Sequence, residues 1–174
     1  PIPSDGQIYN PNSLLYGAKT LQIKAMTARE EDILAANALL KEGKVISTLI
    51  RSCLIEKNID PDEMISGDRN ALMVSIRITG YGASYPYSSI CENCGEVNKN
   101  EADLSDLAIK RLAISPVEPG KNEFLFTLPV TGKNVTFRFL SEKDDKDRRR
   151  SSAVLKKTAD TQVENSLSLI HISE

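Results

Sequence analysis

Residues 64–82 read MISGDRNALMVSIRITGYG, and this stretch decides which fold we expect. It starts with Ser-Gly-Asp at 66–68, residue types that commonly cap helix N-termini. Positions 71–78 are then apolar apart from one serine and Arg77, whose guanidinium needs a partner. A helix that is apolar over most of its surface is buried, so the pattern predicts a central helix. Glycine weakens helices, and the Gly-Tyr-Gly run at 80–82 therefore predicts where this helix ends.

Two helices are predicted upstream, at 27–42 and at 45–54. Thr27 and Glu30 match a capping box, in which each side chain accepts a hydrogen bond from the backbone N–H of the other residue. Gly43 is placed to end the first helix. In the second helix the apolar residues recur at helical spacing and form one stripe. The two helices predict a helical hairpin that packs against the central helix.

Downstream of the central helix the apolar spacing changes from helical to alternating. Tyr85 and Tyr87 face one way on a first strand, and the CENCG run at 91–95 turns the chain into a returning strand. A second pair of strands is predicted at 122–128 and 135–140, because the residues between them have hairpin turn chemistry.

These elements predict an α+β fold. An N-terminal helical hairpin and a central helix pack on a small antiparallel sheet that carries a Cys-x-x-Cys knuckle, and a charged C-terminal helix begins at Ser141. We expect five consecutive segments: an extended N-terminal arm (1–26), a helical part (27–82), the knuckle and antiparallel sheet (83–140), the charged helix (141–166) and a tail (167–174).

The tail, LSLIHISE, resembles the peptide encoded by one frame of a sequencing adapter. We therefore expect the natural protein to continue differently after about Ser166, and the tail to carry no function. This interpretation also discounts His171, the sole histidine of the chain.

Composition excludes several classes of protein. Apolar residues make up 40% of the 174 positions and charged residues 26%, so a core can form. The net charge of −2 and the absence of tryptophan disfavour a dedicated nucleic-acid binder with a base-stacking platform. No run approaches the roughly 20 apolar residues of a membrane helix, and the start does not resemble a secretory signal. We expect an intracellular protein whose three cysteines are thiols or metal ligands.

Cys91 and Cys94, followed by Gly95, have metal-ligand spacing, because backbone N–H groups in such a turn point at the sulfurs. Structural zinc takes four ligands, so this pair is a half-site. Cys53 lies on an apolar helical stripe, where a buried, inert thiol is the commoner outcome. Three interpretations stay open: completion by a second copy in a symmetric dimer, completion by another protein, or a metal-free hairpin. A redox role is less favoured, because a thioredoxin-like motif opens a helix.

No catalytic set emerges from the residues, so we do not expect an enzyme. A Ser–His or Cys–His arrangement needs a histidine outside the tail. Gly132 and Lys133 lack the other residues of a phosphate loop, and a hairpin turn explains them. Asp144, Asp145 and Asp147 are interleaved with Lys and Arg, as on a solvated helix face.

Several runs occur in an order that resembles a known family: MTAREEDIL at 26–34, GDRNALM at 67–73, IRITGYG at 76–82, CENCG at 91–95, DLSDL at 103–107, FLFTLP at 124–129 and FRFL at 137–140. Together, over about residues 20–145, they resemble the baseplate protein family of T-even-type contractile-tailed bacteriophages, whose members are baseplate hub or tail-assembly proteins. The resemblance implies a structural or assembly protein that contacts other baseplate or tail proteins, with no catalysis. It also implies a place in the host cytoplasm during assembly and in the tail baseplate of the virion, and is compatible with a homo-oligomer.

We expect the partner contacts at six signature residues, which are Gly67, Asp68, Arg69, Gly80, Tyr81 and Gly82. The residues alone, apart from any family resemblance, predict that Asp68 and Arg69 cap a helix and make a salt bridge. The competing hypothesis is a zinc-knuckle module that binds nucleic acid. A third hypothesis, an enzyme, would need a catalytic residue in the natural C-terminus that we expect in place of the tail after about Ser166.

Overall fold

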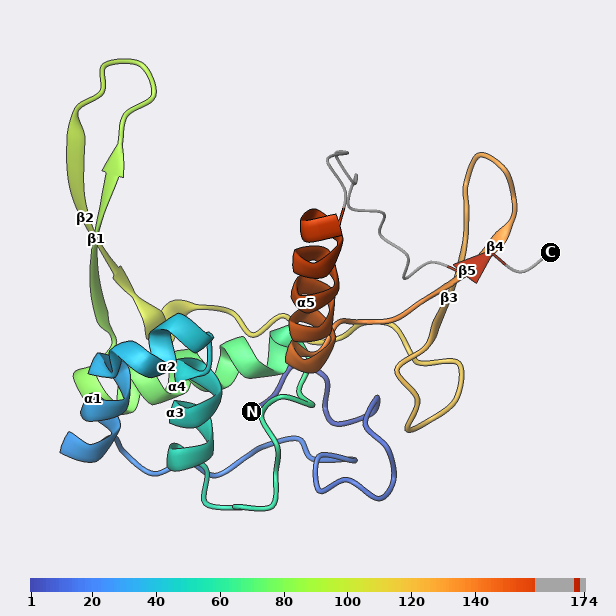
Figure 1. The fold of residues 1–174 in the computed structure, drawn as a ribbon, viewed down its shortest axis with the longest axis horizontal. Helices are drawn as coiled ribbons and strands as arrows, with labels where there is room; N and C mark the ends of the chain where they lie inside the picture. The colour runs from blue at the N-terminus through green and yellow to red at the C-terminus, as the bar shows by residue number, and fades with distance from the viewer. Residues whose placement is uncertain (159–170, 173–174) are drawn as a thin grey trace. The chain divides into compact units, whose positions relative to one another are not determined.

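The computed structural model has an α+β fold, as the residue patterns predict, and it describes residues 1–158 and 171–172 (Figure 1). The helices are α1 (Ala28–Ala35), α2 (Asn37–Glu42), α3 (Val45–Cys53), α4 (Ser66–Tyr81) and α5 (Glu142–Thr158), with a short 3-10 helix η1 (Leu104–Asp106). The strands are β1 (Ser84–Ile90), β2 (Val97–Asp103), β3 (Phe124–Thr127), β4 (Asn134–Phe137) and β5 (His171–Ile172). Within the described residues they form two antiparallel sheets, β1-β2 and β3-β4-β5.

The chain divides into two compact units, each built from segments that are far apart in the sequence. The first unit combines Pro1–Leu21, Lys57–Arg69 and Arg111–Glu174, and the second combines Gln22–Glu56 and Asn70–Lys110. The first turn of α4 therefore belongs to the first unit and its remainder to the second. The five consecutive segments stay a prediction, and of the expected charged helix and tail, 159–170 and 173–174 lie outside the described residues.

In the second unit, the prediction of one continuous helix at 27–42 is wrong, because the structure has two helices there. The chain breaks at Ala36 (φ −71°, ψ 99°), which separates α1 from α2. Alanine favours helix, so packing and not local sequence imposes this break. Both α1 and α2 contact α3, whereas one straight helix would meet α3 at a single crossing. Gly43 ends α2 in the left-handed conformation, as predicted (φ 65°).

Helix α3 buries the stripe predicted from its spacing. Val45, Leu49, Ile50 and Cys53 are buried, and the Cys53 thiol is fully enclosed. The expected buried thiol is therefore confirmed. In α4, Leu72 and Ile76 are buried while most of its other apolar side chains are only partly covered, so this helix is less enclosed than its composition predicts.

Strands β1 and β2 form a hairpin that pairs from Ser84 with Asp103 to Ile90 with Val97 (Figure 1). The sequence predicts that the helices pack on this sheet, and that expectation is wrong. All the residues of both strands are exposed except Ala102, which is half-buried. Serine and asparagine side chains lie on one face of the ribbon, and serine and charged side chains lie on the other, so neither face is apolar enough to be buried against a helix.

The first unit takes much of its core from its N-terminal segment. Residues 1–21 contain no helix or strand, in agreement with their Pro, Gly, Asn and Ser content. Yet Ile2, Ile8, Tyr9 and Leu15 in this segment are buried. The segment is therefore an integral part of the packing of this unit.

The remainder of the first unit holds the second sheet and α5. Strands β3 and β4 form the predicted hairpin, although each strand is shorter than expected. Phe124 packs against Phe137 and Phe139, with ring centroids 5.4 Å and 5.0 Å away. Among the helices that the structure describes, none is long and apolar enough to cross a membrane.

Candidate contact surfaces and metal half-site

The carboxylate of Asp68 lies in the first turn of α4 and is completely buried. It accepts hydrogen bonds from the Ser4 N–H (2.9 Å), the Ser4 hydroxyl (2.5 Å) and the Tyr9 hydroxyl (2.6 Å). The Tyr9 oxygen in turn accepts from the Ile65 N–H (3.2 Å). Burial and the negative charge of Asp68 both raise the pKa of the Tyr9 hydroxyl far above its usual value. Asp68 thus holds the N-terminal segment inside the first unit.

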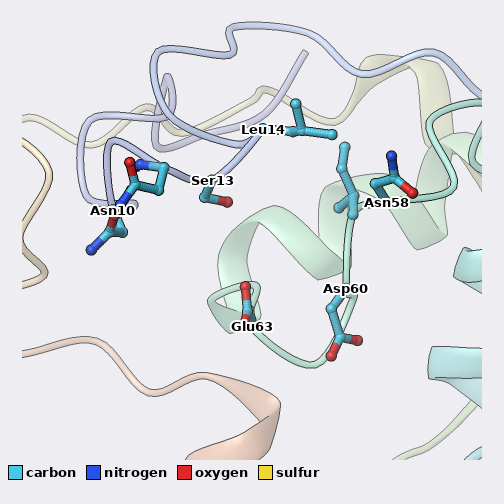
Figure 2. Close-up of a pocket in the computed structure, with 8 residues that line it drawn as sticks. Asn10, Ser13, Leu14, Asn58, Asp60 and Glu63 are labelled. Carbon is cyan, nitrogen blue, oxygen red and sulfur yellow. Dashed lines mark hydrogen bonds between the residues drawn. The ribbon is translucent and has the colours of Figure 1, made fainter.

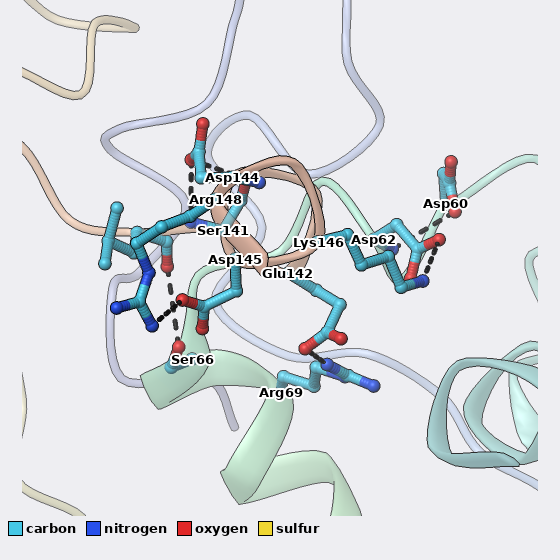
Figure 3. Close-up of polar contacts among 11 residues, drawn as sticks. Asp60, Asp62, Ser66, Arg69, Ser141, Glu142, Asp144, Asp145, Lys146 and Arg148 are labelled. Carbon is cyan, nitrogen blue, oxygen red and sulfur yellow. Dashed lines mark hydrogen bonds and ion pairs between the residues drawn. The ribbon is translucent and has the colours of Figure 1, made fainter. Parts of the chain in front are cut away.

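Arg69, the next residue, is also buried, and it forms an ion pair with Glu142 of α5. Figure 3 shows Glu142 and Lys146 extending from α5 toward Arg69 and Asp62. Lys146 Nζ lies 2.7 Å from a carboxylate oxygen of Asp62. The salt bridge expected of Arg69 is therefore confirmed. The alternative, that Asp68 and Arg69 contact a partner protein, stays a prediction, and both side chains already have partners inside this unit.

The N-terminus of α5 is capped by Ser141. Its hydroxyl accepts from the Asp144 N–H (3.3 Å), and the Asp144 carboxylate accepts from the Ser141 N–H (2.9 Å). Burial of Asp144 opposes its ionisation, but hydrogen bonds from Arg138 and Ser141 outweigh this effect and lower the pKa of Asp144 to about 2. Asp145 pairs with Arg148 at 3.0 Å. These carboxylates therefore serve ion pairs on the helix surface, as their interleaving with cations predicts.

The C-terminal end of α4 holds the other three expected contact residues. Gly80 lies against the methyl group of Met26, and Gly82 adopts the left-handed conformation (φ 81°) that ends the helix. Tyr81 is 51% exposed. The guanidinium of Arg77 lies 4.9 Å from the centroid of the Tyr81 ring, so Arg77 finds here the partner that its place in the helix requires.

Arg77 also ties the start of the β1-β2 hairpin to α4. It donates hydrogen bonds to the carbonyl oxygens of Gly82 (3.0 Å) and Ser84 (3.3 Å). Its guanidinium lies 5.9 Å from the centroid of the Tyr85 ring. The helix end and the first strand are thereby held together by one side chain.

The two faces of this hairpin differ in charge. We call one of them the tyrosine face; the strand register places on it Tyr85, Tyr87, Ser89, Asn98, Asn100 and Ala102. It bears no charged side chain, and both tyrosines are 45% exposed. The opposite face carries Lys99, Glu101 and Asp103. The alternation of Tyr85 and Tyr87 indicated this face in the sequence, but its lack of cover is visible only in the structure.

The knuckle lies in the loop between β1 and β2. The Cys91 N–H donates to the Glu96 carbonyl (2.9 Å), the Gly95 N–H donates to the Cys91 carbonyl (2.9 Å), and Gly95 has a positive φ of 72°. Backbone N–H groups of Cys94 and Asn93 donate to the Cys91 sulfur, and together with the Cys94 thiol they lower the pKa of Cys91. Neither cysteine is in a disulfide.

A zinc site at this knuckle stays a prediction. In the described part of the chain there is no group of three or more His, Cys, Asp or Glu side chains that could hold a metal ion. Cys53 belongs to the core, and the side chain of His171 lies outside the described residues.

An open pocket of about 460 Å³ lies in the first unit, where the N-terminal segment faces the loop that precedes α4 (Figure 2). It is lined by Asn10, Asn12, Ser13, Leu14, Asn58, Ile59, Asp60 and Glu63. One carboxylate oxygen of Asp60 accepts from the Asp62 N–H at 3.1 Å, so this side chain shapes its own turn. The lining offers carboxylates, amides and the Ser13 hydroxyl, and it includes no histidine, cysteine or lysine.

A family model described as T4 bacteriophage base plate protein matches residues 7–171. No curated protein matches the chain, and no solved structure does.

Proposed function

The chain belongs to the T4 bacteriophage base plate protein family, and from this we propose that it is a structural or assembly protein of the baseplate hub that acts through protein–protein contacts. It is a baseplate protein by family membership. The place in the hub, the assembly in the host cytoplasm and the contact surface are parts of the proposal. We assign the main contact with another baseplate protein to the tyrosine face of the β1-β2 hairpin.

The observation that carries this assignment is the exposure of a whole hairpin. A two-stranded ribbon with no covered face is only marginally stable in water, and 13 of its 14 strand residues are exposed. Packing against a neighbouring protein would remove Tyr85 and Tyr87 from water and order the ribbon. Burial of these rings in a complex would therefore supply the stability that the isolated ribbon lacks.

The composition of the tyrosine face also supports a protein partner. Tyrosine buries a large area at low entropic cost, and serine and asparagine supply adaptable hydrogen bonds, a combination that recurs in protein-binding surfaces. Tyr81, half-exposed at the end of α4, lies on the guanidinium of the same arginine as Tyr85. Arg77 thus places two aromatic rings together at the base of the hairpin.

The competing hypothesis, a nucleic-acid module, fits the hairpin less well. Its strands and loop carry Glu92, Glu96, Glu101 and Asp103 against a single Lys99. Phosphate backbones are bound by an excess of Lys and Arg, and an acidic ribbon repels them.

The test is co-expression with the other baseplate proteins encoded by the same phage, followed by affinity capture of this chain. Tyr87→Ser removes one ring from the tyrosine face without touching Arg77, and we expect it to weaken capture of the partner at least tenfold. Lys99→Ser, on the opposite face, is the matched control and should leave capture unchanged. Equal capture by Tyr87→Ser and the unmodified chain would refute the assignment of this face.

A further inference from the structure

The loop of the β1-β2 hairpin presents two sulfur atoms beside one another at the protein surface. Cys94 is exposed and Cys91 is half-buried, and both lie in one tight turn that is closed by the hydrogen bond from the Gly95 N–H to the Cys91 carbonyl (2.9 Å). Two cysteines at this spacing in one turn can bind one metal ion together.

Two thiolates leave a tetrahedral zinc ion short of two ligands. Structural zinc sites are closed by four protein ligands. The third cysteine is enclosed in the α3 core, and the described residues hold no larger cluster of metal-binding side chains. Within the described residues, no side chain beside the knuckle supplies the missing ligands.

A second copy of the chain supplies those ligands without any further component. In a two-fold symmetric contact each molecule contributes the same surface, so two knuckles provide four thiolates. The last rung of the hairpin, Ile90 opposite Val97, lies next to the knuckle, and these side chains are 70% and 56% exposed. Apolar side chains this exposed would be removed from water where two loops meet.

We propose that two copies of this chain join through their hairpin loops at one tetrahedral zinc ion, bound by Cys91 and Cys94 of each copy. The metal links the copies and organises the loop, and it takes no part in a reaction. This dimer uses the loop, while the proposed baseplate contact uses the tyrosine face, so either proposal can fail without the other.

The test uses the purified full-length chain in a reducing buffer with zinc added. We expect light scattering to give the mass of a dimer and elemental analysis to give about one zinc per two chains. X-ray absorption should show four sulfur neighbours at about 2.3 Å from the metal. Removing the metal with a chelator should return the chain to a monomer, and adding zinc should restore the dimer, a result that needs no substitution.

Variants separate the knuckle from the core thiol. Cys94→Ser should abolish zinc retention and dimer formation, whereas Cys53→Ala, which removes the third cysteine, should retain both. A monomer that holds one zinc per chain, or a dimer that survives the chelator, would overturn the proposal. So would a chain that stays metal-free in excess zinc, or one that retains zinc only when another baseplate protein is added.

Discussion

The hydroxyl of Tyr9 donates a 2.6 Å hydrogen bond to the buried carboxylate of Asp68, across 59 positions of sequence. Ser4 donates two more hydrogen bonds to the same carboxylate. The first turn of α4 therefore depends on the N-terminal segment, and the segment depends on α4. A buried carboxylate is tolerated only when its oxygens are hydrogen-bonded, so the three bonds must form together.

Removal of this carboxylate should destabilise the protein strongly. Asp68→Ala leaves the buried hydroxyls of Ser4 and Tyr9 without their acceptor, and we expect a loss of about 3 kcal/mol in the free energy of unfolding. Tyr9→Phe removes one bond to Asp68 and the acceptor of the Ile65 N–H, at a cost of about 1–2 kcal/mol. Urea unfolding measures both. Tyr87→Phe, on the exposed hairpin, is the control and should stay within about 0.5 kcal/mol.

The ion pair between Arg69 and Glu142 should be strongly coupled, because both side chains are largely buried. Arg69→Ala leaves Glu142 unpaired in that environment, and we expect a cost of about 3 kcal/mol. A double-mutant cycle with Glu142→Ala should give a coupling energy of about 1–3 kcal/mol. The same cycle on the more exposed pair of Arg150 and Asp147 should give less than about 0.5 kcal/mol. Equal coupling in the two cycles would contradict the burial of Arg69.

Gly80 and Gly82 should respond oppositely to alanine. At Gly80 the added methyl group overlaps with the terminal methyl of Met26, which can move aside, and lies at ordinary contact distance from Met26 Cβ and Cγ, so the better helix propensity of alanine should prevail. We expect Gly80→Ala to be neutral or to stabilise by up to about 1 kcal/mol. Gly82→Ala must hold φ at 81° and should cost about 1 kcal/mol, although no atom lies near the added group. Thermal unfolding of the two variants distinguishes these outcomes.

Acid should weaken the second unit through Glu30. Hydrogen bonds from Lys24, Ser52 and Thr27, in that order of size, hold the pKa of this carboxyl well below its usual value of 4.5. A carboxyl whose pKa is lower in the folded state stabilises the fold above its unfolded pKa, and this stabilisation is lost as the pH falls from about 4.5 toward the folded pKa.

Glu30→Gln should therefore flatten the dependence of the unfolding free energy on pH below about pH 4.5. Lys24→Met, which removes the largest of the three causes, should flatten it in part. Denaturant unfolding across the acid range measures both variants. An unchanged acid profile in Glu30→Gln would show that other carboxyls dominate the acid response.

Salt should strengthen the proposed zinc-linked dimer. Glu92 and Glu96 are exposed beside the cysteines, so two loops that meet bring four glutamates and four thiolates around one zinc ion. Raising the ionic strength from about 0.01 M to about 0.1 M shortens the Debye length from about 30 Å to about 10 Å and screens this repulsion. Sedimentation at the two salt levels should show tighter association at the higher one.

Glu92→Gln should reproduce the effect of salt on that dimer at low ionic strength. Glu101→Gln, farther from the loop on the same hairpin, is the matched control and should change association less. A dimer that weakens as salt is added would indicate that opposite charges, and not zinc and apolar contacts, join the copies.

The candidate surfaces were visible in the sequence to different degrees. The alternation of Tyr85 and Tyr87 and the spacing of Cys91 and Cys94 indicated which side chains share a face and a turn, because strand and turn geometry act over a few residues. That none of the described helices covers the hairpin was not visible there. It depends on whether distant segments pack on the ribbon, which no local pattern reports.

By itself the sequence determined the features that arise from neighbours three or four positions apart: the buried stripe of α3, the capping box of Thr27 and Glu30, and the left-handed turns at Gly43 and Gly82. Only the tertiary structure decided the break at Ala36, the core role of residues 1–21 and the partners of Asp68 and Arg69. The physical reason is that backbone geometry and capping are settled within a turn of helix or a rung of sheet. A buried charge, by contrast, is stabilised by whichever donors the folded chain brings to it, and for Asp68 these lie 59 and 64 positions away.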